Sequence, residues 1–188
     1  MGLLPKQVEL GLQFTTKLMG EDYEIPNYKL AEIQSQIIDW NLCRNNINYD
    51  ADSELDMALD ELYREYEDAE SDEQRIDALN DFYIVYTGTL AKSGRKEEEL
   101  TPELLELYEE FKKIPKRVKS LGYCFRRAMK ECLAEINSRE QDLEQAKEWA
   151  ENGASSKWLK NLNQNPDTLY KADYSKALLC KDCDGKEG

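Results

Sequence analysis

The chain has 188 residues and a formal net charge of −14, from 25 basic and 39 acidic side chains. This length suits a single domain, and no apolar run approaches the roughly 20 residues that a membrane-spanning helix needs. We therefore expect no membrane partner. Because so acidic a surface repels the phosphates of nucleic acid, we also expect no stable nucleic acid binding. The first residues lack the apolar core of a secretory signal, so we expect a cytoplasmic protein.

The charges are unevenly distributed along the chain. Residues 50–73 hold twelve acids and one base, whereas residues 111–130 hold eight bases and no acid. A merely solvated surface would mix the signs. The segregation favours acids that hold a metal near bases that meet phosphate, with an acidic surface that mimics DNA as the alternative.

Two residue types limit the chemistry. The sequence has no His, so hydrolysis would depend on carboxylates, Lys or a metal ion. Of the five cysteines, Cys180 and Cys183 form one C-x-x-C, which supplies too few ligands for a structural zinc site.

Apolar residues at helical spacing predict an all-α fold, in one domain over residues 1–188. Taken in chain order, the expected helices cover residues 6–18, 28–43, 53–69, 73–91, 101–115, 120–136 and 142–150. Ser53, Ser71 and Thr101 are the expected N-caps, Thr101 being followed by Pro102. We expect Pro115 to end its helix. Residues 153–171 are expected to form a loop, and no segment alternates as a strand does.

Two acidic pairs give the clearest functional signal. Glu61 and Glu65 are four residues apart on one expected helix, and Asp77 and Asp81 are four apart on the next. A short connection predicts that these helices pack antiparallel, so the pairs would converge. Carboxylate oxygens are ligands that Mg²⁺ prefers. A solvated acidic face is the alternative, but Asp77 and Asp81 lie among apolar neighbours, where an unpaired acid is costly.

Several runs resemble MazG-like proteins. These runs are Ile37-Ile38-Asp39-Trp40-Asn41-Leu42-Cys43-Arg44-Asn45, Leu59-Asp60-Glu61-Leu62-Tyr63-Arg64-Glu65, residues 75–86, residues 134–140 and residues 169–176. Together they cover roughly residues 28–176, apart from a helical insertion near 95–119, and the C-terminal runs resemble phage-type members. The resemblance implies a helical bundle with a four-helix core completed by dimerisation.

The same resemblance implies a nucleoside triphosphate pyrophosphohydrolase, which releases a monophosphate and pyrophosphate with Mg²⁺, or Mn²⁺ in its place. It implies catalytic roles for Glu61, Glu65 and Asp77, and metal ligands at these residues, Asp81 and Glu73. The sequence departs from the family's metal motif in two places. The first pair is one residue wider than Glu-x-x-Glu, and Gln74 stands where the family has an acid.

Substrate contacts are expected from Trp40, Arg44, Asn80, Lys171, Tyr174 and Lys176. In this interpretation the segment around Tyr174 closes over the site, and Lys171 and Lys176 bind the β- and γ-phosphates. Three other bases, Arg126, Arg127 and Lys130, are alternatives for phosphate. Trp40, Tyr83 and Tyr86 would stack on a base or belong to the core.

Two rival functions stay open. One is a hydrolase of a signalling nucleotide, and the other is a catalytically degenerate acidic protein that mimics DNA or inhibits a host protein. A homo-dimer or homo-tetramer is expected, with Ile76, Leu79, Phe82 and Val85 buried between subunits. A phage-encoded protein of this kind would act in the host cytoplasm.

Overall fold

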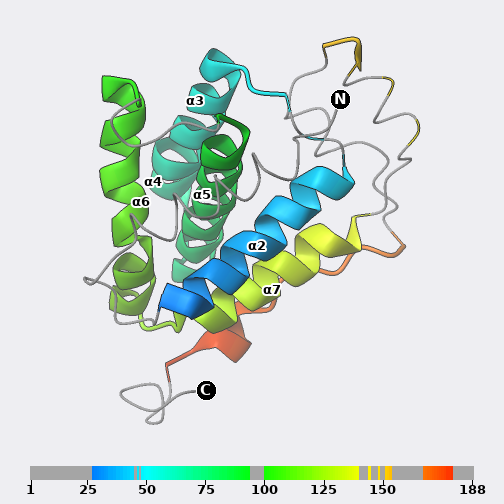
Figure 1. Cartoon of the computed structure of the whole chain (residues 1–188). Helices are drawn as coiled ribbons and strands as arrows, with labels where there is room; N and C mark the ends of the chain where they lie inside the picture. Colours follow the sequence, from blue (N-terminus) through cyan, green and yellow to red (C-terminus); the bar gives the residue numbers. More distant parts are fainter. Residues whose placement is uncertain are drawn as a thin grey trace.

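The computed structural model describes residues 27–44, 46, 48–93, 100–139, 144, 148, 151–153 and 167–179. Within them the fold is all-α, as predicted (Figure 1). The elements are α2 (Asn27–Cys43), α3 (Ala51–Leu59), the π-helix η1 (Asp60–Glu65), α4 (Tyr66–Asp68), α5 (Asp72–Ser93), α6 (Pro102–Ser120), α7 (Phe125–Ser138) and the 3-10 helix η3 (Tyr174–Ala177). The predicted helix at 6–18, most of that at 142–150, most of the loop before 167, and Cys180 and Cys183 lie outside the described residues.

Helix starts follow the capping signals of the sequence. Thr101 caps α6 by accepting a hydrogen bond from the backbone N–H of Leu104, with Pro102 in the first turn. The Ser71 hydroxyl accepts from the N–H of Gln74 at the start of α5. The predicted Ser53 cap is wrong by three residues, because the Asp50 carboxylate is the cap and accepts from the Ser53 N–H.

The expectation that Pro115 ends its helix is wrong. α6 continues through Pro115 to Ser120, and the side chains of Ile114, Pro115 and Val118 are all buried. The packing of this face outweighs the hydrogen bond that a proline removes. The next helix also begins later than predicted, at Phe125, because Gly122 adopts a φ of 90° in the turn between the helices.

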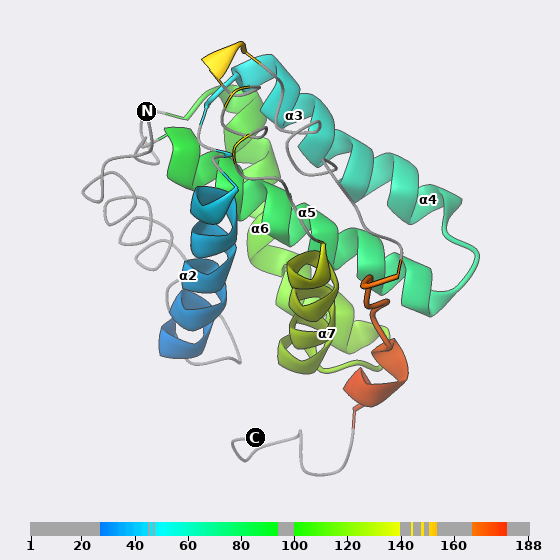
Figure 2. The same ribbon diagram turned by 90° about the vertical axis from the view of Figure 1, so that its right-hand side faces the viewer.

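α5 is the central helix. It packs against α2, α3, η1, α4, α6 and α7, and nearly all of its residues from Ile76 to Lys92 are buried. The tight turn after α4 returns the chain, so that α3, η1 and α4 lie along α5 (Figure 2). The two acidic helices are therefore neighbours, as the sequence predicts.

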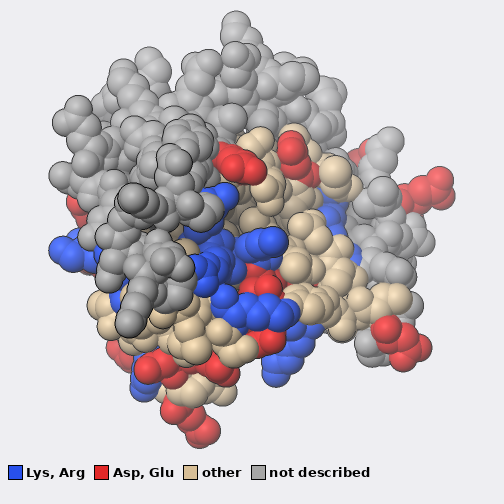
Figure 3. Space-filling model, turned by 90° about the horizontal axis from the view of Figure 1, so that it is seen from below, with Lys and Arg blue, Asp and Glu red and all other residues tan. Residues whose placement is uncertain are grey.

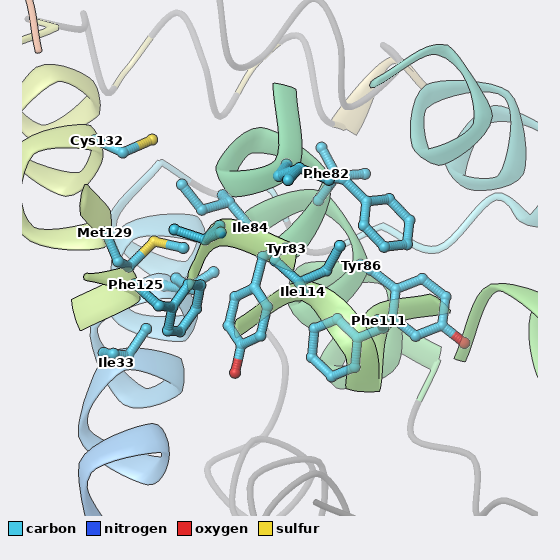
Figure 4. Packing of buried hydrophobic residues seen from close by; sticks show 14 of the residues in the cluster. Ile33, Phe82, Tyr83, Ile84, Tyr86, Phe111, Ile114, Phe125, Met129 and Cys132 are labelled. Carbon is cyan, nitrogen blue, oxygen red and sulfur yellow. The ribbon is translucent and has the colours of Figure 1, made fainter. Parts of the chain in front are cut away.

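Aromatic rings join α5 to α6 (Figure 4). Tyr83 and Tyr86 lie with their ring centroids 4.5 and 5.1 Å from that of Phe111. The Tyr86 hydroxyl donates to the Leu104 carbonyl, and the Gln34 amide donates to the Tyr83 hydroxyl. Each such ring pair contributes about 0.5–1.5 kcal/mol beyond its buried area. Tyr83 and Tyr86 are thus core residues, and the segment predicted as an insertion supplies part of the core.

The four apolar side chains expected at a subunit interface are buried within the single chain. Ile76, Leu79 and Phe82 are 0% exposed, and Val85 is 4% exposed. Their burial requires no second copy, so it no longer argues for an oligomer. Among the described helices, none has the length and apolar character to cross a membrane.

A buried ion pair fixes α3 on α5. The Lys92 ammonium contacts the Glu54 carboxylate, and the Thr89 hydroxyl donates to the same carboxylate at 2.7 Å. Both charged side chains are almost fully buried, and such pairs are costly to break because one charge is then left unpaired. Glu54 therefore belongs to the core, although it lies in the acid-rich run.

Candidate functional site

A cleft of about 1140 Å³ lies between α3–η1 and α5. Its charged lining includes Glu61 and Glu65 from η1, Asp81 from α5, and two arginines, Arg64 and Arg139. Trp40 and Ile136 line it as well. Three of the predicted metal ligands therefore face one space, together with cations suited to phosphate.

The π-helix explains how one short segment presents so many side chains to the cleft. Five of its six residues, all except Leu62, line the cleft, and Leu62 is 1% exposed in the core. The side chains facing the core, Ala58, Leu62 and Tyr66, are spaced by four, which exceeds the 3.6 residues of an α-helical turn. A π-helix has a wider turn, with bonds from residue i to i+5, and often occurs at functional sites. It keeps Leu62 inward while Glu61 and Glu65 remain on the cleft side.

Asp77 lies beside this cleft and is mostly buried. Its Oδ1 accepts a hydrogen bond of 2.5 Å from the Tyr174 hydroxyl. Burial raises the pKa of the Asp77 carboxyl; the Tyr174 bond opposes this rise, and the negative charges of Glu135 and Glu65 add to it. Excess negative charge around a buried carboxyl is the setting that a bound cation would relieve.

Asp81, one turn further along α5, accepts a hydrogen bond from the Cys132 thiol at 3.4 Å. Burial raises the pKa of Cys132 well above its ordinary value, with further contributions from Asp81 and Asp77. The thiol therefore stays protonated and acts as a neutral donor. No sequence pattern pointed to Cys132 as a partner of the acids.

Glu73 lies apart from the other predicted ligands. It is exposed in the first turn of α5 and does not line the cleft. Gln74, the residue that departs from the family pattern, accepts from the N–H of Glu70 in the turn before α5. Its role here is to cap that turn.

Trp40 and Arg44 meet the C-terminal end of α7. The Trp40 indole N–H donates to the Ile136 carbonyl at 3.1 Å, and the Arg44 guanidinium donates to the carbonyls of Ile136 and Arg139. The guanidinium also lies 4.6 Å from the Trp40 ring centroid. Burial lowers the pKa of Arg44. Trp40 forms a wall of the cleft, whereas Arg44 is committed to capping α7.

The other predicted substrate contacts are separated. Asn80 is fully buried, does not line the cleft, and its amide atoms have no hydrogen-bond partner within the described part of the chain. Lys171 is exposed. Lys176 contacts Glu131 and the Tyr170 hydroxyl on the outer side of α7. Of the C-terminal residues predicted to contact substrate, it is Tyr174 that reaches the acids.

Arg139 is one of the functional candidates that sequence reasoning missed. It lines the cleft directly after α7, and its guanidinium lies 3.5 Å from Glu135. The signal was its position inside residues 134–140, one of the runs that resemble MazG-like proteins. Arg126, Arg127 and Lys130 lie toward the other end of α7 and do not line the cleft. On the face seen from below, basic side chains surround a smaller acidic group (Figure 3).

The cleft supplies carboxylate oxygens, which are ligands that Mg²⁺ prefers. Within the described ranges, no three acidic or sulfur side chains are close enough together to share one ion. Mg²⁺ usually takes only one or two carboxylates, however, and completes its shell with waters and substrate phosphates. Glu61, Glu65 and Asp81 supply hard oxygen donors to one cleft, with Asp77 beside them.

Comparison with known proteins found no match for this chain. No family model matches the chain, and neither a curated protein nor a solved structure matches it. The resemblance to MazG-like proteins therefore stays a prediction from the residues quoted above.

Proposed function

We propose that the protein hydrolyses a nucleoside or deoxynucleoside triphosphate to the monophosphate and pyrophosphate with Mg²⁺, and so controls a nucleotide pool. One observation carries the proposal: Glu61, Glu65 and Asp81 line the same cleft as two arginines. Carboxylates that bind a metal, facing guanidinium groups that bind phosphate, are what cleavage of a phosphoanhydride needs.

Within this proposal the acids divide the work. Mg²⁺, or Mn²⁺ in its place, is bound by Asp77 and one carboxylate of the cleft, from among Glu61, Glu65 and Asp81, and waters and phosphate oxygens complete its shell. A bound ion of this kind neutralises phosphate oxygens and lowers the pKa of a bound water. A carboxylate of the set that is not engaged in binding accepts the proton of the attacking water.

The phosphates are assigned to Arg139 and Arg64. Both line the cleft, whereas Lys176 does not line it and contacts Glu131 on the outer side of α7. The planar guanidinium binds two phosphate oxygens at once, which suits it to orient a triphosphate. Arg64 also contacts Asp60 and Glu65 of η1, so it links the acids to the phosphate side.

A catalytically degenerate binding protein is the second candidate. The observation that favours it is the exposed acidic surface of α3 and α4, where Asp52, Asp56, Glu67 and Asp68 face solvent. Such a surface imitates the charge of a phosphate backbone and would occupy the DNA site of a host protein. A hydrolase of a signalling nucleotide keeps the proposed chemistry and changes only the substrate.

A screen of nucleotides for Mg²⁺-dependent pyrophosphate release separates these candidates. The pyrophosphohydrolase predicts that a nucleoside triphosphate gives equal amounts of pyrophosphate and monophosphate, with no inorganic phosphate. Preferential cleavage of a signalling nucleotide would identify that nucleotide, instead of an ordinary triphosphate, as the substrate. Absence of pyrophosphate release from every nucleotide would refute both hydrolases and leave the binding protein.

We also propose a homo-dimer or homo-tetramer located in the cytoplasm, which is the host cytoplasm if the gene belongs to a phage. Leu59 and Tyr63, which are 37% and 44% exposed at the cleft, are apolar residues that a second subunit would cover. Light scattering at micromolar concentration tests the assembly, and a monomer at every concentration would contradict it.

A further inference from the structure

Two neutral donors hold the acidic pair of α5. The Tyr174 hydroxyl donates to Asp77 at 2.5 Å, and the Cys132 thiol donates to Asp81 at 3.4 Å. Tyr174 is 6% exposed and Cys132 is 2% exposed, so bulk water does not compete with either donor for its carboxylate. The first donor comes from η3 and the second from α7, and η3 packs against α7, which in turn packs against α5.

The segment that carries Tyr174 is fastened at both ends of α7. Near the C-terminal end of α7, the Tyr170 N–H donates to the Ser138 hydroxyl at 2.8 Å. Near its N-terminal end, the Cys124 N–H donates to the Ala177 carbonyl at 2.7 Å, and the Leu179 N–H donates to Gly122 at 2.9 Å. Ala177, next to these bonds, is fully buried.

Further bonds fill the space between these anchors. The Ala172 N–H donates to Glu135 at 2.8 Å, and the Asp173 N–H donates to Glu131 at 3.2 Å. The Asp173 carboxylate in turn caps η3 by accepting from Ser175. These bonds hold the segment against α7 on both sides of Tyr174.

We infer that Tyr174 is a positioning residue of the metal site, which fixes the Asp77 carboxylate through its hydroxyl. The inference rests on the proposed function. A carboxylate bound to a metal is commonly held by an outer hydrogen bond that sets its orientation, and loss of that bond typically weakens metal binding about 10- to 100-fold. One oxygen of Asp77 is engaged by Tyr174, which restricts the directions in which the other can bind. Cys132 holds Asp81 in the same way with a weaker donor.

Tyr170 offers a matched control on the same segment. Its hydroxyl donates to Glu131 of α7 instead of an acid of α5. Tyr174→Phe and Tyr170→Phe each remove one hydroxyl and its hydrogen bond to a carboxylate. A general loosening of the segment would appear in both variants, whereas a loss of positioning at Asp77 would appear only in the first.

The test is a titration of the full-length protein and both variants with Mn²⁺, in which free ion is followed by electron paramagnetic resonance. We expect Tyr174→Phe to raise the Kd for Mn²⁺ about 10- to 100-fold. Tyr170→Phe should stay within about threefold of the wild type, because it leaves the acids of α5 untouched. Thermal melts should show similar small losses for the two variants. At saturating metal, the KM for nucleotide should change little in either.

Equal Mn²⁺ affinity in Tyr174→Phe and the wild type would overturn the inference and leave the proposed function standing. Tighter binding in Tyr174→Phe would also overturn it, because the tyrosine would then be a latch that competes with the metal. A wild-type protein that neither binds Mn²⁺ nor releases pyrophosphate would overturn the proposed function together with the inference.

Discussion

The side of α5 that faces α6 is filled with aromatic rings, whereas the side that faces η1 carries acids beside a cleft. On the first side, Tyr83 and Tyr86 pack on Phe111, and both tyrosine hydroxyls have buried partners. On the second side, Asp77 is mostly buried among other negative charges, and burial raises its pKa.

The difference shows where stability and function are separated in this fold. The aromatic side uses regular α-helices, and the hydroxyls of Tyr83 and Tyr86 have buried partners, which favours one rigid arrangement. The acidic side uses a π-helix and a buried carboxyl, features that are costly and that concentrate at functional sites. Substitutions on the two sides should therefore affect different properties.

The largest effect on folding is expected from Phe111→Ala. Phe111 is fully buried and contacts the rings of Tyr83, Tyr86 and Tyr108. Its truncation leaves a cavity and should lower the free energy of unfolding by about 3–5 kcal/mol. Urea denaturation measures this. A loss below about 1 kcal/mol would mean that the aromatic side does not dominate stability.

Arg139→Ala should act on kinetics instead. If this guanidinium binds phosphate, its loss removes a charge-assisted hydrogen bond of about 1.5–3 kcal/mol, which corresponds to roughly a 10- to 100-fold fall in kcat/KM. The double variant Lys171→Ala, Lys176→Ala is the comparison, and we expect it to stay near wild type because neither lysine lines the cleft. A larger fall in kcat/KM in the lysine double variant than in Arg139→Ala would place the phosphate site at the C-terminal lysines.

Deletion of one residue should distinguish the π-helix from a regular helix. Removing Tyr63, which is 44% exposed within η1, lets the segment return to α-helical turns while Leu62 keeps its place. We expect a cost of about 1–2 kcal/mol in the free energy of unfolding. Deleting Ala78 from α5 should be far worse, because it rotates every later side chain out of register. Equal costs for both deletions would show that η1 has no wider turn to release.

The smallest effect is expected from Asp77→Asn, measured with a chelator present. Burial raises the pKa of Asp77 in the folded state, so the ionised carboxyl destabilises the fold at neutral pH. Asn removes this charge and still accepts from Tyr174. The variant should therefore melt slightly above the wild type at neutral pH. Its advantage should shrink as the pH falls through the raised pKa toward 3.8, the ordinary value. A lower melting temperature for the variant at neutral pH would argue against this electrostatic cost.

The sequence was informative where structure depends on local signals. Thr101 and Ser71 cap their helices as predicted, because capping is decided by neighbouring residues. The spacing of the acids also predicted that Glu61 and Glu65 on one helix would face Asp81 on the next, and all three line the cleft.

Tertiary contacts decided the features that sequence reasoning missed. Pro115 stays in its helix because its neighbours are buried, which no local rule records. The bond from Tyr174 to Asp77 joins residues 97 positions apart. The π-helix follows from a core spacing of four, whose meaning is visible only once Leu62 is known to face inward.

Release of pyrophosphate by Asp77→Ala, measured with saturating Mg²⁺, tests the central claim most directly. We expect the loss of this carboxylate to reduce turnover by at least roughly 100-fold, which is the upper limit for losing a residue that only hydrogen-bonds a metal ligand. Helix content, measured by circular dichroism, should be unchanged. Asp68→Ala is the control, because Asp68 is an exposed acid of α4 that does not line the cleft. Its turnover should equal that of the wild type. Undiminished turnover in Asp77→Ala would contradict the account, because Asp77 would then have no part in the reaction.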